Sequence, residues 1–271
     1  MKNKVKELWA ADKPVLHGWL SIGNAFTAEI MASQGYDAIS VDVQHGALDY
    51  SSLLPMYQAM RASGVTLGAR VSWLEPGIIM KALDAGAQII ICPMISTAEQ
   101  AATFVSYLRY PPHGQRSFGP TRAKFAMPGY GPAINNEIIA LAMIETAEGL
   151  ANLDAIAATP GLDGIYVGPA DLTLGTQGQR LPAGFDRQEP EMIEILQQIA
   201  KTCLRHGIQP CIHCGTPEYA VKAIDWGYRL TTVSGDSRLL DAAAKATVSR
   251  FRELTEGTTE GAAATPGEVG Y

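Results

Sequence analysis

The sequence lacks the features that mark nucleic-acid-binding, membrane and secreted proteins. Its 21 lysines and arginines are outnumbered by 27 acidic residues, which gives a formal net charge of −6. A nucleic-acid surface needs clustered Lys and Arg, and no such cluster occurs. No uninterrupted apolar run reaches the roughly 20 residues of a membrane span. The opening MKNKVKELWAADKP also lacks the apolar core of a secretory signal. We therefore expect a soluble cytoplasmic protein.

Cysteine is also scarce, with 4 residues in the chain. Cys92 lies in the apolar run IIICPMI, as expected of a small buried side chain. Cys211 and Cys214 have the C-x-x-C spacing of redox and metal sites, but no second Cys/His pair completes a tetrahedral site. We predict that these thiols, and that of Cys203, are free.

Apolar runs alternate with segments of helical spacing along most of the chain. The runs predict buried strands at 15–21, 38–43, 66–71, 88–94, 138–144, 164–167, 209–212 and 230–233. The intervening segments predict helices at 27–34, 51–62, 76–85, 98–108, 149–158, 190–206, 217–226 and 237–254. This alternation predicts an α/β fold, a single-domain (β/α)₈ TIM barrel over residues 1–255. A doubly wound open sheet is the alternative, although it normally places fewer strands in this length.

Two segments depart from the alternation. Residues 110–137 form a long Pro/Gly-rich insertion between the fourth predicted helix and the fifth strand. Helix-to-strand connections lie at the opposite end of a barrel from its active face, so Arg116, Arg122 and Lys124 are expected to serve a neighbouring subunit's site or an oligomer contact. Residues 256–271 (EGTTEGAAATPGEVGY) are poor in bulky apolar groups, and we predict a disordered tail.

Polar side chains follow most of the predicted strands, at the end where a barrel builds its active site. They are Trp19 and Ser21; Asp42, Gln44 and His45; Arg70, Ser72 and Trp73; Glu145; residues 168–171 with Asp171; His213; and Ser234, Gly235 and Asp236. Each alone has a structural explanation, such as an ion pair for Arg70 or a helix-dipole contact for Glu145. Together they indicate a functional site.

The residue types at these strand ends favour metal chemistry. Glu145 and Asp171 directly follow two adjacent predicted strands, and paired carboxylates suit an oxygen-loving divalent ion. His45 has no nearby His partner, which favours an acid–base role over metal binding. A Schiff-base aldolase requires a lysine that projects into the barrel from a strand, and no lysine follows any of the predicted strands here. The sequence also lacks G-x-S-x-G, Walker A and G-x-G-x-x-G motifs. What remains is metal-assisted chemistry on a small oxygen-rich molecule.

Several motifs, in a fixed order along the chain, resemble those of a known protein family. They are D-x-x-H at Asp42 and His45, ARVSW at 69–73, KALDAGAQ at 81–88, RYPPHGQRSFG at 109–119, IET at 144–146 and VGPADL at 167–172. With these, residues 18–251 resemble the class II, metal-dependent pyruvate aldolases of the HpcH/HpaI aldolase family. That family includes 4-hydroxy-2-oxoheptanedioate and 2-dehydro-3-deoxyglucarate aldolases.

The resemblance implies a role for each matching residue. Glu145 and Asp171 would bind the metal, Mg²⁺ or Mn²⁺, with Co²⁺ and Zn²⁺ as alternatives. His45, paired with Asp84, would act as the base with a metal-bound water. Arg70 would hold the pyruvate oxygen, and the 168–171 loop would offer backbone N–H groups, among them those of Gly168 and Ala170, to the carboxylate. Trp19 and His213 would line the substrate pocket.

The implied reaction is reversible aldol cleavage. The metal chelates a 2-oxo acid and acidifies its C3 protons, and the enolate adds to an aldehyde; the reverse direction cleaves a 4-hydroxy-2-oxo acid to pyruvate and an aldehyde. The alternatives are oxaloacetate decarboxylation or a 2-oxo-acid-binding barrel without turnover. Members of the family assemble as trimers and hexamers, so the resemblance also implies a homo-oligomer.

The chain departs from the family pattern at three positions that bear on specificity. Gln44 stands where many members have Glu, which removes a charge near the metal, around which Asp42 is also expected to lie. Met143 stands two residues before Glu145, where Gln is often found. His213 replaces an aliphatic residue of the aldehyde pocket, and we expect it to contact the aldehyde's hydroxyls or terminal carboxylate.

Overall fold

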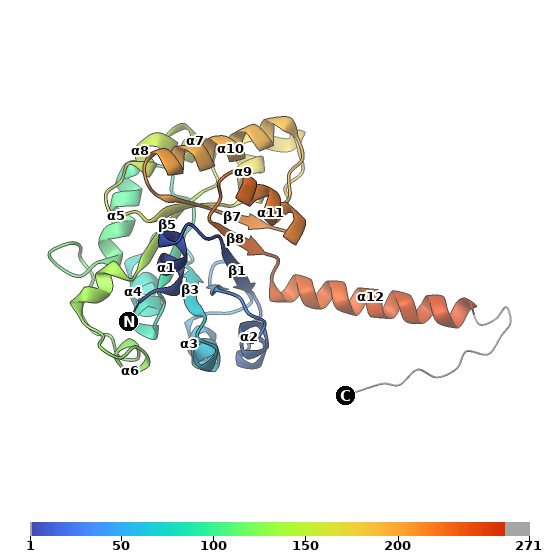
Figure 1. Ribbon diagram of the computed structural model, residues 1–271, viewed down its shortest axis with the longest axis horizontal. Helices are drawn as coiled ribbons and strands as arrows, with labels where there is room; N and C mark the ends of the chain where they lie inside the picture. Colours follow the sequence, from blue (N-terminus) through green and yellow to red (C-terminus); the bar gives the residue numbers. More distant parts are fainter. Residues whose placement is uncertain (1, 258–271) are drawn as a thin grey trace. The chain divides into compact units, whose positions relative to one another are not determined.

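The computed structural model describes residues 2–257, and its strands close into a parallel barrel (Figure 1). The strands are β1 Val15–Leu20, β2 Ala38–Asp42, β3 Thr66–Arg70, β4 Ile89–Cys92, β5 Ile139–Ile144, β6 Gly164–Val167, β7 Gln209–Cys214 and β8 Leu230–Val233. Each strand pairs with the next along the chain, and β8 pairs with β1. The predicted barrel is confirmed, and closure excludes the open sheet.

The predicted helices all occur and surround the barrel strands in the part of the chain that forms it (Figure 1). The helices are α1 Lys4–Ala10, α2 Ala25–Ala32, α3 Tyr50–Ala59, α4 Pro76–Ala85, α5 Ala98–Leu108, α6 Ala123–Ala126, α7 Ala147–Ala151, α8 Leu153–Ala157, α9 Pro169–Gln177, α10 Pro190–Arg205, α11 Pro217–Asp225 and α12 Asp236–Gly257. Three 3₁₀ helices join them: η1 Met60–Ser63, η2 Pro132–Asn136 and η3 Gly178–Arg180. The sequence patterns missed α1, α6 and α9, and the expected helix at 149–158 is divided at Asn152.

Local chemistry fixes where the helices begin and end. At the start of α4 the Glu75 carboxylate accepts from the amides of Gly77 and Ile78, and Pro76 occupies the first turn, where its missing N–H costs nothing. Gly86 ends the helix with a φ of 116°, a left-handed conformation that glycine adopts without a Cβ clash. These signals set the first and last residues of α4, the helix that connects β3 to β4.

Apolar residues form two cores, one between strands and helices and one inside the barrel. The inner core includes Val15, Ile91, Leu141 and Tyr166, all at most 1% exposed. Side chains alternate between the faces of a strand, so each strand contributes to both cores. Val5 of α1 belongs to the inner core, which places α1 across the amino ends of the strands.

The insertion at 110–137 packs at the amino ends of the strands, as expected for a connection between α5 and β5. Its Arg116 is buried, and its guanidinium donates to Asp84 and to the Tyr130 hydroxyl, both at 2.8 Å. Phe118 and Phe125 in the same segment are 64% and 72% exposed. The insertion therefore combines a buried ionic anchor with exposed aromatic side chains.

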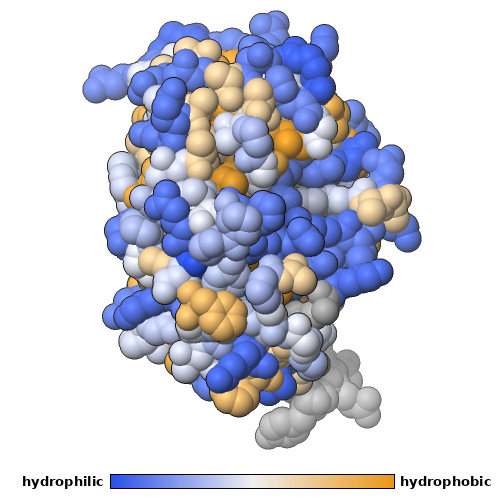
Figure 2. All heavy atoms as spheres, turned by 90° about the vertical axis from the view of Figure 1, so that its left-hand side faces the viewer, coloured by the Kyte–Doolittle hydropathy of each residue, from blue (hydrophilic) through white to orange (hydrophobic). Residues whose placement is uncertain are grey.

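The chain divides into a unit ending at Asp236, which contains the barrel, and a second unit from residue 237, of which α12 is described. The expected division into a domain at 1–255 and a tail at 256–271 stays a prediction, because residues 258–271 lie outside the described residues. None of the described helices is long and apolar enough to cross a membrane. The face in Figure 2 is largely hydrophilic, with scattered apolar side chains.

Candidate active site

Asp42, at the end of β2, organises the carboxyl end of the barrel. Its carboxylate is 3% exposed and accepts from the amides of Gln44 and His45 at 3.1 and 3.2 Å. It also accepts from the Trp19 indole at 3.3 Å. These bonds turn the chain at the strand end and hold the β2–α3 connection against β1. Asp42 therefore holds the backbone of His45 and the Trp19 indole in place at the barrel mouth.

Arg70 completes the Asp42 cluster from the neighbouring strand. The β2–β3 register sets the two residues opposite each other, and Arg70 donates through Nε at 2.9 Å and Nη2 at 2.5 Å. Its guanidinium carbon lies 4.9 Å from the centre of the Trp19 ring. Such a two-point contact fixes the plane of the guanidinium. Among described residues Nη1 has no protein partner, so it remains as a donor at the barrel mouth.

Glu145 lies at the end of β5, buried and only partly paired. Its Oε1 accepts from the Met94 amide at 2.7 Å, whereas its buried Oε2 has no partner among the described residues. Burial raises the pKa of Glu145 to about 7, and the charge of Asp171 adds to the rise, while the Met94 hydrogen bond and Arg70 lower it. An unpaired buried acceptor beside another acid is costly unless a cation or a donor joins it.

Asp171 lies in a helix, where the sequence predicted a loop. Residues 168–171 are the cap and first turn of α9, because Pro169 suits the first turn of a helix and Gly168 caps it with extended backbone. A Cβ on Gly168 would lie 2.8 Å from Glu145 Oε2, so glycine leaves room for that carboxylate. The free N–H groups of the first turn replace those expected of the loop, including that of Ala170.

The donor set fits a divalent cation of the Mg²⁺ or Mn²⁺ type. The orphaned Oε2 of Glu145 and the exposed Asp171 are hard anionic oxygens that influence each other's charge. Just after the end of β2, the Oε1 of Gln44 is a further buried acceptor without a partner among the described residues. No group of three or more His, Cys, Asp or Glu side chains with metal-binding geometry occurs within 2–257. Two carboxylates leave coordination positions for water and substrate oxygens.

An aromatic wall stands beside these groups. His213, on β7, stacks on Phe185 with ring centres 4.6 Å apart and meets the edge of Trp19 at 5.0 Å. Trp19 also stacks with Tyr166 at 6.0 Å. Phe185 comes from the connection between η3 and α10, and no local pattern marked it. The wall gives the mouth an apolar side with the His213 imidazole as a polar group.

A buried chain of hydrogen bonds leads from His213 into the interior of the barrel. Its Nδ1 lies 3.1 Å from the Tyr166 hydroxyl, which lies 2.6 Å from Thr232 Oγ1. Thr232 in turn lies 2.6 Å from Nδ1 of His17, whose Nε2 is 2.9 Å from the Ser40 hydroxyl. Complete burial lowers the pKa of His17 to about 3, so this imidazole is neutral. These hydrogen bonds therefore hold Nδ1 of His213 against a neutral partner, the Tyr166 hydroxyl.

Comparison with known proteins now places the chain. The family model for HpcH/HpaI aldolase/citrate lyase matches residues 16–237. The chain belongs to this family. Hydroxypyruvate/pyruvate aldolase of Rhizorhabdus wittichii is 36% identical to it, covering 93% of this chain and 100% of that relative. A 4-hydroxy-2-oxo-heptane-1,7-dioate aldolase of Salmonella dublin is 31% identical over 93% of this chain and 95% of its own.

Solved structures agree with the family assignment. An HpcH/HpaI aldolase/citrate lyase family protein from Burkholderia cenocepacia superimposes with a TM-score of 0.84 at 30% identity, over 93% of this chain and 100% of that one. Like its named relatives, this member of the HpcH/HpaI family is an enzyme of the aldolase type. The resemblance seen in the sequence motifs is confirmed.

Within one copy of this aldolase, Asp84 does not meet His45. Asp84 lies one residue before the end of α4, hence near the amino ends of the strands, and its Oδ1 accepts from Arg116 at 2.8 Å. His45 follows β2 at the carboxyl end, is exposed, and its imidazole has no partner among the described residues. The pairing expected from the resemblance is therefore absent within the chain, since a ten-residue helix separates the two ends by about 15 Å.

Other site residues escaped the sequence patterns. Met94 has a φ of 58°, which is uncommon for a residue with a side chain, and this turn aims its amide at Glu145. Tyr166 was treated only as part of a strand, although an inward position on β6 would have marked it. Met143, which the sequence comparison did single out, is 3% exposed inside the barrel, next to Gly168. The four cysteines are free, as predicted, and all four are buried, as expected for Cys92.

Proposed function

We propose that this aldolase uses a divalent metal to cleave a 4-hydroxy-2-oxo acid reversibly into pyruvate, or a similar 2-oxo acid, and an aldehyde. The observation that supports this most directly is the orphaned, buried Oε2 of Glu145 beside Asp171, within the electrostatic reach of Arg70. A relative at 36% identity that is named for hydroxypyruvate and pyruvate supports the 2-oxo acid class.

The metal would supply Lewis acidity toward the oxygens of the 2-oxo acid, held by Glu145 and Asp171. Arg70 would donate from Nη1 to the oxo oxygen, where negative charge develops as the C3 proton leaves. Because Asp42 holds Nε and Nη2, the guanidinium needs little reorganisation to do so. The N–H groups at the start of α9, among them that of Ala170, would bind the substrate carboxylate.

His45 would move the protons. Its backbone amide is anchored on Asp42, while its imidazole is exposed at the mouth and free to meet a substrate or a water molecule. An imidazole needs its second nitrogen oriented to work efficiently. Since Asp84 of the same copy lies at the other end of the barrel, we propose that Asp84 serves His45 of a neighbouring copy, which requires the expected trimer or hexamer.

The aldehyde would enter along the aromatic wall. Trp19 and Phe185 offer apolar faces, and His213 offers a ring nitrogen to a hydroxyl or carboxylate of the aldehyde. Gln44, with its buried unpaired Oε1, would accept a hydrogen bond from a water or hydroxyl near the metal. These residues would set specificity without taking part in the proton transfers.

The test combines metal binding with turnover. We expect Glu145→Gln and Asp171→Asn to lose Mn²⁺ binding by calorimetry and to lose aldol cleavage, since each removes one of two anionic ligands. Glu148→Gln is the matched control, because Glu148 lies in the first turn of α7 next to the site. Borohydride reduction with pyruvate should leave the wild type unlabelled, and a trapped lysine adduct would refute the metal mechanism. Oxaloacetate consumed without an aldehyde partner would favour decarboxylation instead.

A further inference from the structure

A chain of four hydrogen bonds runs from the mouth of the barrel into its interior. It joins, in this order, His213, Tyr166, Thr232, His17 and Ser40. The last four of these side chains are 0% exposed. Among the described residues, the three hydroxyl groups have no hydrogen-bond partners outside this chain. The side chains must therefore satisfy one another with the hydrogens that they carry.

The number of hydrogens in this chain decides how they are placed. Each hydroxyl group carries one hydrogen, and so does each neutral imidazole. His17 is neutral, because burial lowers its pKa to about 3. A hydrogen bond holds one hydrogen between its two atoms, so five hydrogens fill the four bonds and leave one over. The side chain that keeps the remaining hydrogen fixes the direction of every bond.

A hydroxyl group in the interior is an unfavourable place for the remaining hydrogen. On Ser40, Thr232 or Tyr166 it would be a buried donor without an acceptor, which is costly and rare in folded proteins. His17 cannot keep it, because both of its ring nitrogens already belong to the chain. On Nε2 of His213 it lies outside the chain, on a side chain that is only half-buried. Every bond then donates toward the mouth, and the Tyr166 hydroxyl donates to Nδ1 of His213.

The surroundings of His213 direct its Nε2 toward the mouth. Nδ1 faces inward to the Tyr166 hydroxyl at 3.1 Å, and the two nitrogens of an imidazole point in roughly opposite directions. Phe185 stacks on the ring with an interplanar angle of 18°, and Trp19 lies edge-on to it at 74°. These contacts keep the ring from turning over. Protonation of His213 would add a hydrogen at Nδ1 and leave the one on Nε2, so Nε2 donates in either charge state.

We propose that this hydrogen-bond chain holds His213 in the tautomer with a protonated Nε2, so that His213 is a hydrogen-bond donor to the aldehyde. The role toward the aldehyde rests on the proposed function, whereas the tautomer does not depend on it. A donor favours an aldehyde whose substituent carries an acceptor oxygen, such as a hydroxyl or an ether. It disfavours an aldehyde whose substituent can only donate, such as an ammonium group.

Solid-state ¹⁵N NMR of the full protein with labelled histidine reads the tautomer directly. The chain has 5 histidines, and His213→Phe identifies the His213 signals by their loss. Above the ordinary pKa of imidazole, without metal or substrate, we expect an unprotonated Nδ1 and a protonated Nε2. The opposite tautomer, or an equal mixture of the two, overturns the proposal even in an active aldolase. The expected tautomer in a protein without aldol cleavage would instead refute the proposed function alone.

Two hydroxyl deletions test whether the hydrogen-bond chain sets this tautomer. Tyr166→Phe leaves Nδ1 of His213 without its donor, so both tautomers should appear in the spectrum. Tyr228→Phe is the matched control, because it removes an equally buried hydroxyl that donates to the Leu196 carbonyl at 2.9 Å, outside the chain. It should keep the single tautomer of the wild type. If Tyr166→Phe keeps it as well, the chain does not set the tautomer and the proposal fails.

Paired aldehydes test the donor role of His213. Methoxyacetaldehyde differs from butanal by an oxygen in place of a methylene group, and 3-methoxypropanal differs from pentanal in the same way. In at least one pair, the ratio of kcat/KM for the ether to that for the alkyl aldehyde should fall roughly three- to tenfold in His213→Phe, the effect of one hydrogen bond. Tyr228→Phe should keep the ratios of the wild type. Unchanged ratios in both pairs for His213→Phe would overturn the donor role.

Discussion

At the residue scale, the barrel interior shows how a polar side chain is tolerated in a core. His17, Thr232 and Tyr166 are fully or almost fully buried, yet each side chain has a hydrogen-bond partner. The chain ends on His213 at the mouth, so the same bonds that satisfy the core also orient a group of the candidate site. Tyr166 is therefore a positioning residue.

Tyr166→Phe should change aldehyde selection without changing the chemistry of the 2-oxo acid. Loss of the hydroxyl removes its hydrogen bond to Nδ1 of His213, and one hydrogen bond contributes about 0.5–1.5 kcal/mol, up to about tenfold in KM. We expect KM to rise for glyceraldehyde and to stay unchanged for propanal, with unaltered exchange of pyruvate methyl protons. Equal effects on both aldehydes would show that Tyr166 acts only on the fold.

His17 should make the protein less stable as the pH falls. Its folded pKa, about 3, lies below the ordinary 6.5, so below pH 6.5 the unfolded chain takes up a proton that the folded chain refuses. The free energy of unfolding should then fall by up to about 1.4 kcal/mol per pH unit. His17→Gln should remove this part of the pH dependence in denaturant titrations. The exposed His113→Gln, as control, should retain the slope of the wild type.

At the element scale, the carboxyl ends of the strands were the predictable part of the site. Asp42, Arg70 and Glu145 each end or directly follow an apolar strand, and barrel geometry then brings them to one mouth. The start of α9 was read as a loop, because Gly168 and Pro169 look like turn residues before a helix is known to follow.

Contacts between distant segments left no local signal. Asp84 meets Arg116, 32 residues away, and the Met94 amide meets Glu145, 51 residues away. Phe185 comes from a connecting segment with no periodicity to mark it. Such contacts depend on how the α5–β5 insertion and the other connections pack. These connections have no hydrophobic periodicity from which their packing could be predicted.

Gly168→Ala should damage the metal site more than the fold. The φ of Gly168 is −97°, which alanine adopts readily, but the new Cβ would lie 2.8 Å from Glu145 Oε2 and 2.5 Å from Met143 Cε. We expect Mn²⁺ affinity to fall roughly 10–100-fold, as when the support of a ligand is disturbed, with about 1–3 kcal/mol lost in stability. Gly119→Ala is the control, since no atom lies within 4 Å of its Cβ. Equal Mn²⁺ affinity in both variants would contradict this role.

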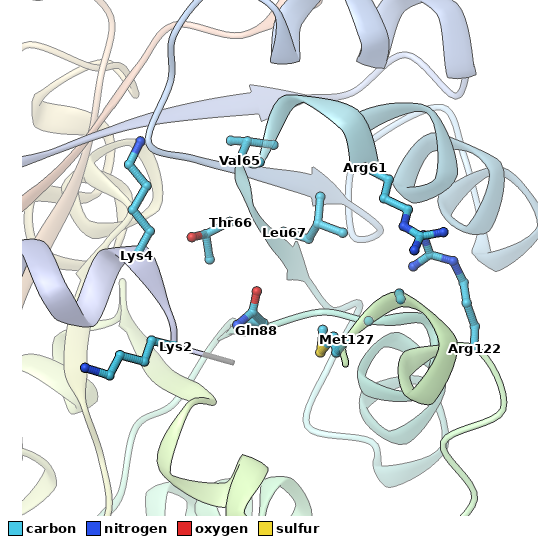
Figure 3. A pocket seen from close by; sticks show the side chains of 12 residues that line it. Lys2, Lys4, Arg61, Val65, Thr66, Leu67, Gln88, Arg122 and Met127 are labelled. Atoms are coloured by element: carbon cyan, nitrogen blue, oxygen red, sulfur yellow. The ribbon is translucent and has the colours of Figure 1, made fainter. Parts of the chain in front are cut away.

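At the scale of the whole molecule, the two ends of the barrel differ in charge and chemistry. The carboxyl end carries the acids Glu145 and Asp171, while the amino end carries the basic side chains of Lys2, Arg61 and Arg122 (Figure 3) and the Asp84–Arg116 pair. The side chain of Asp84 is 25% exposed, and the insertion that holds its partner Arg116 also carries the exposed Phe118 and Phe125. Exposed aromatic groups around a charged group are typical of interfaces.

If Asp84 serves His45 of another copy, two inactive variants should restore each other. His45→Ala and Asp84→Asn should each lose most of the exchange of pyruvate methyl protons as pure oligomers. Refolded together in equal amounts, they should recover roughly a quarter of the wild-type rate, since random assembly joins an intact His45 to an intact Asp84 at one site in four. Light scattering should show trimers or hexamers in every sample. A mixture as inactive as its parents would leave Asp84 with the structural role of holding Arg116, and a monomer would exclude the shared site altogether.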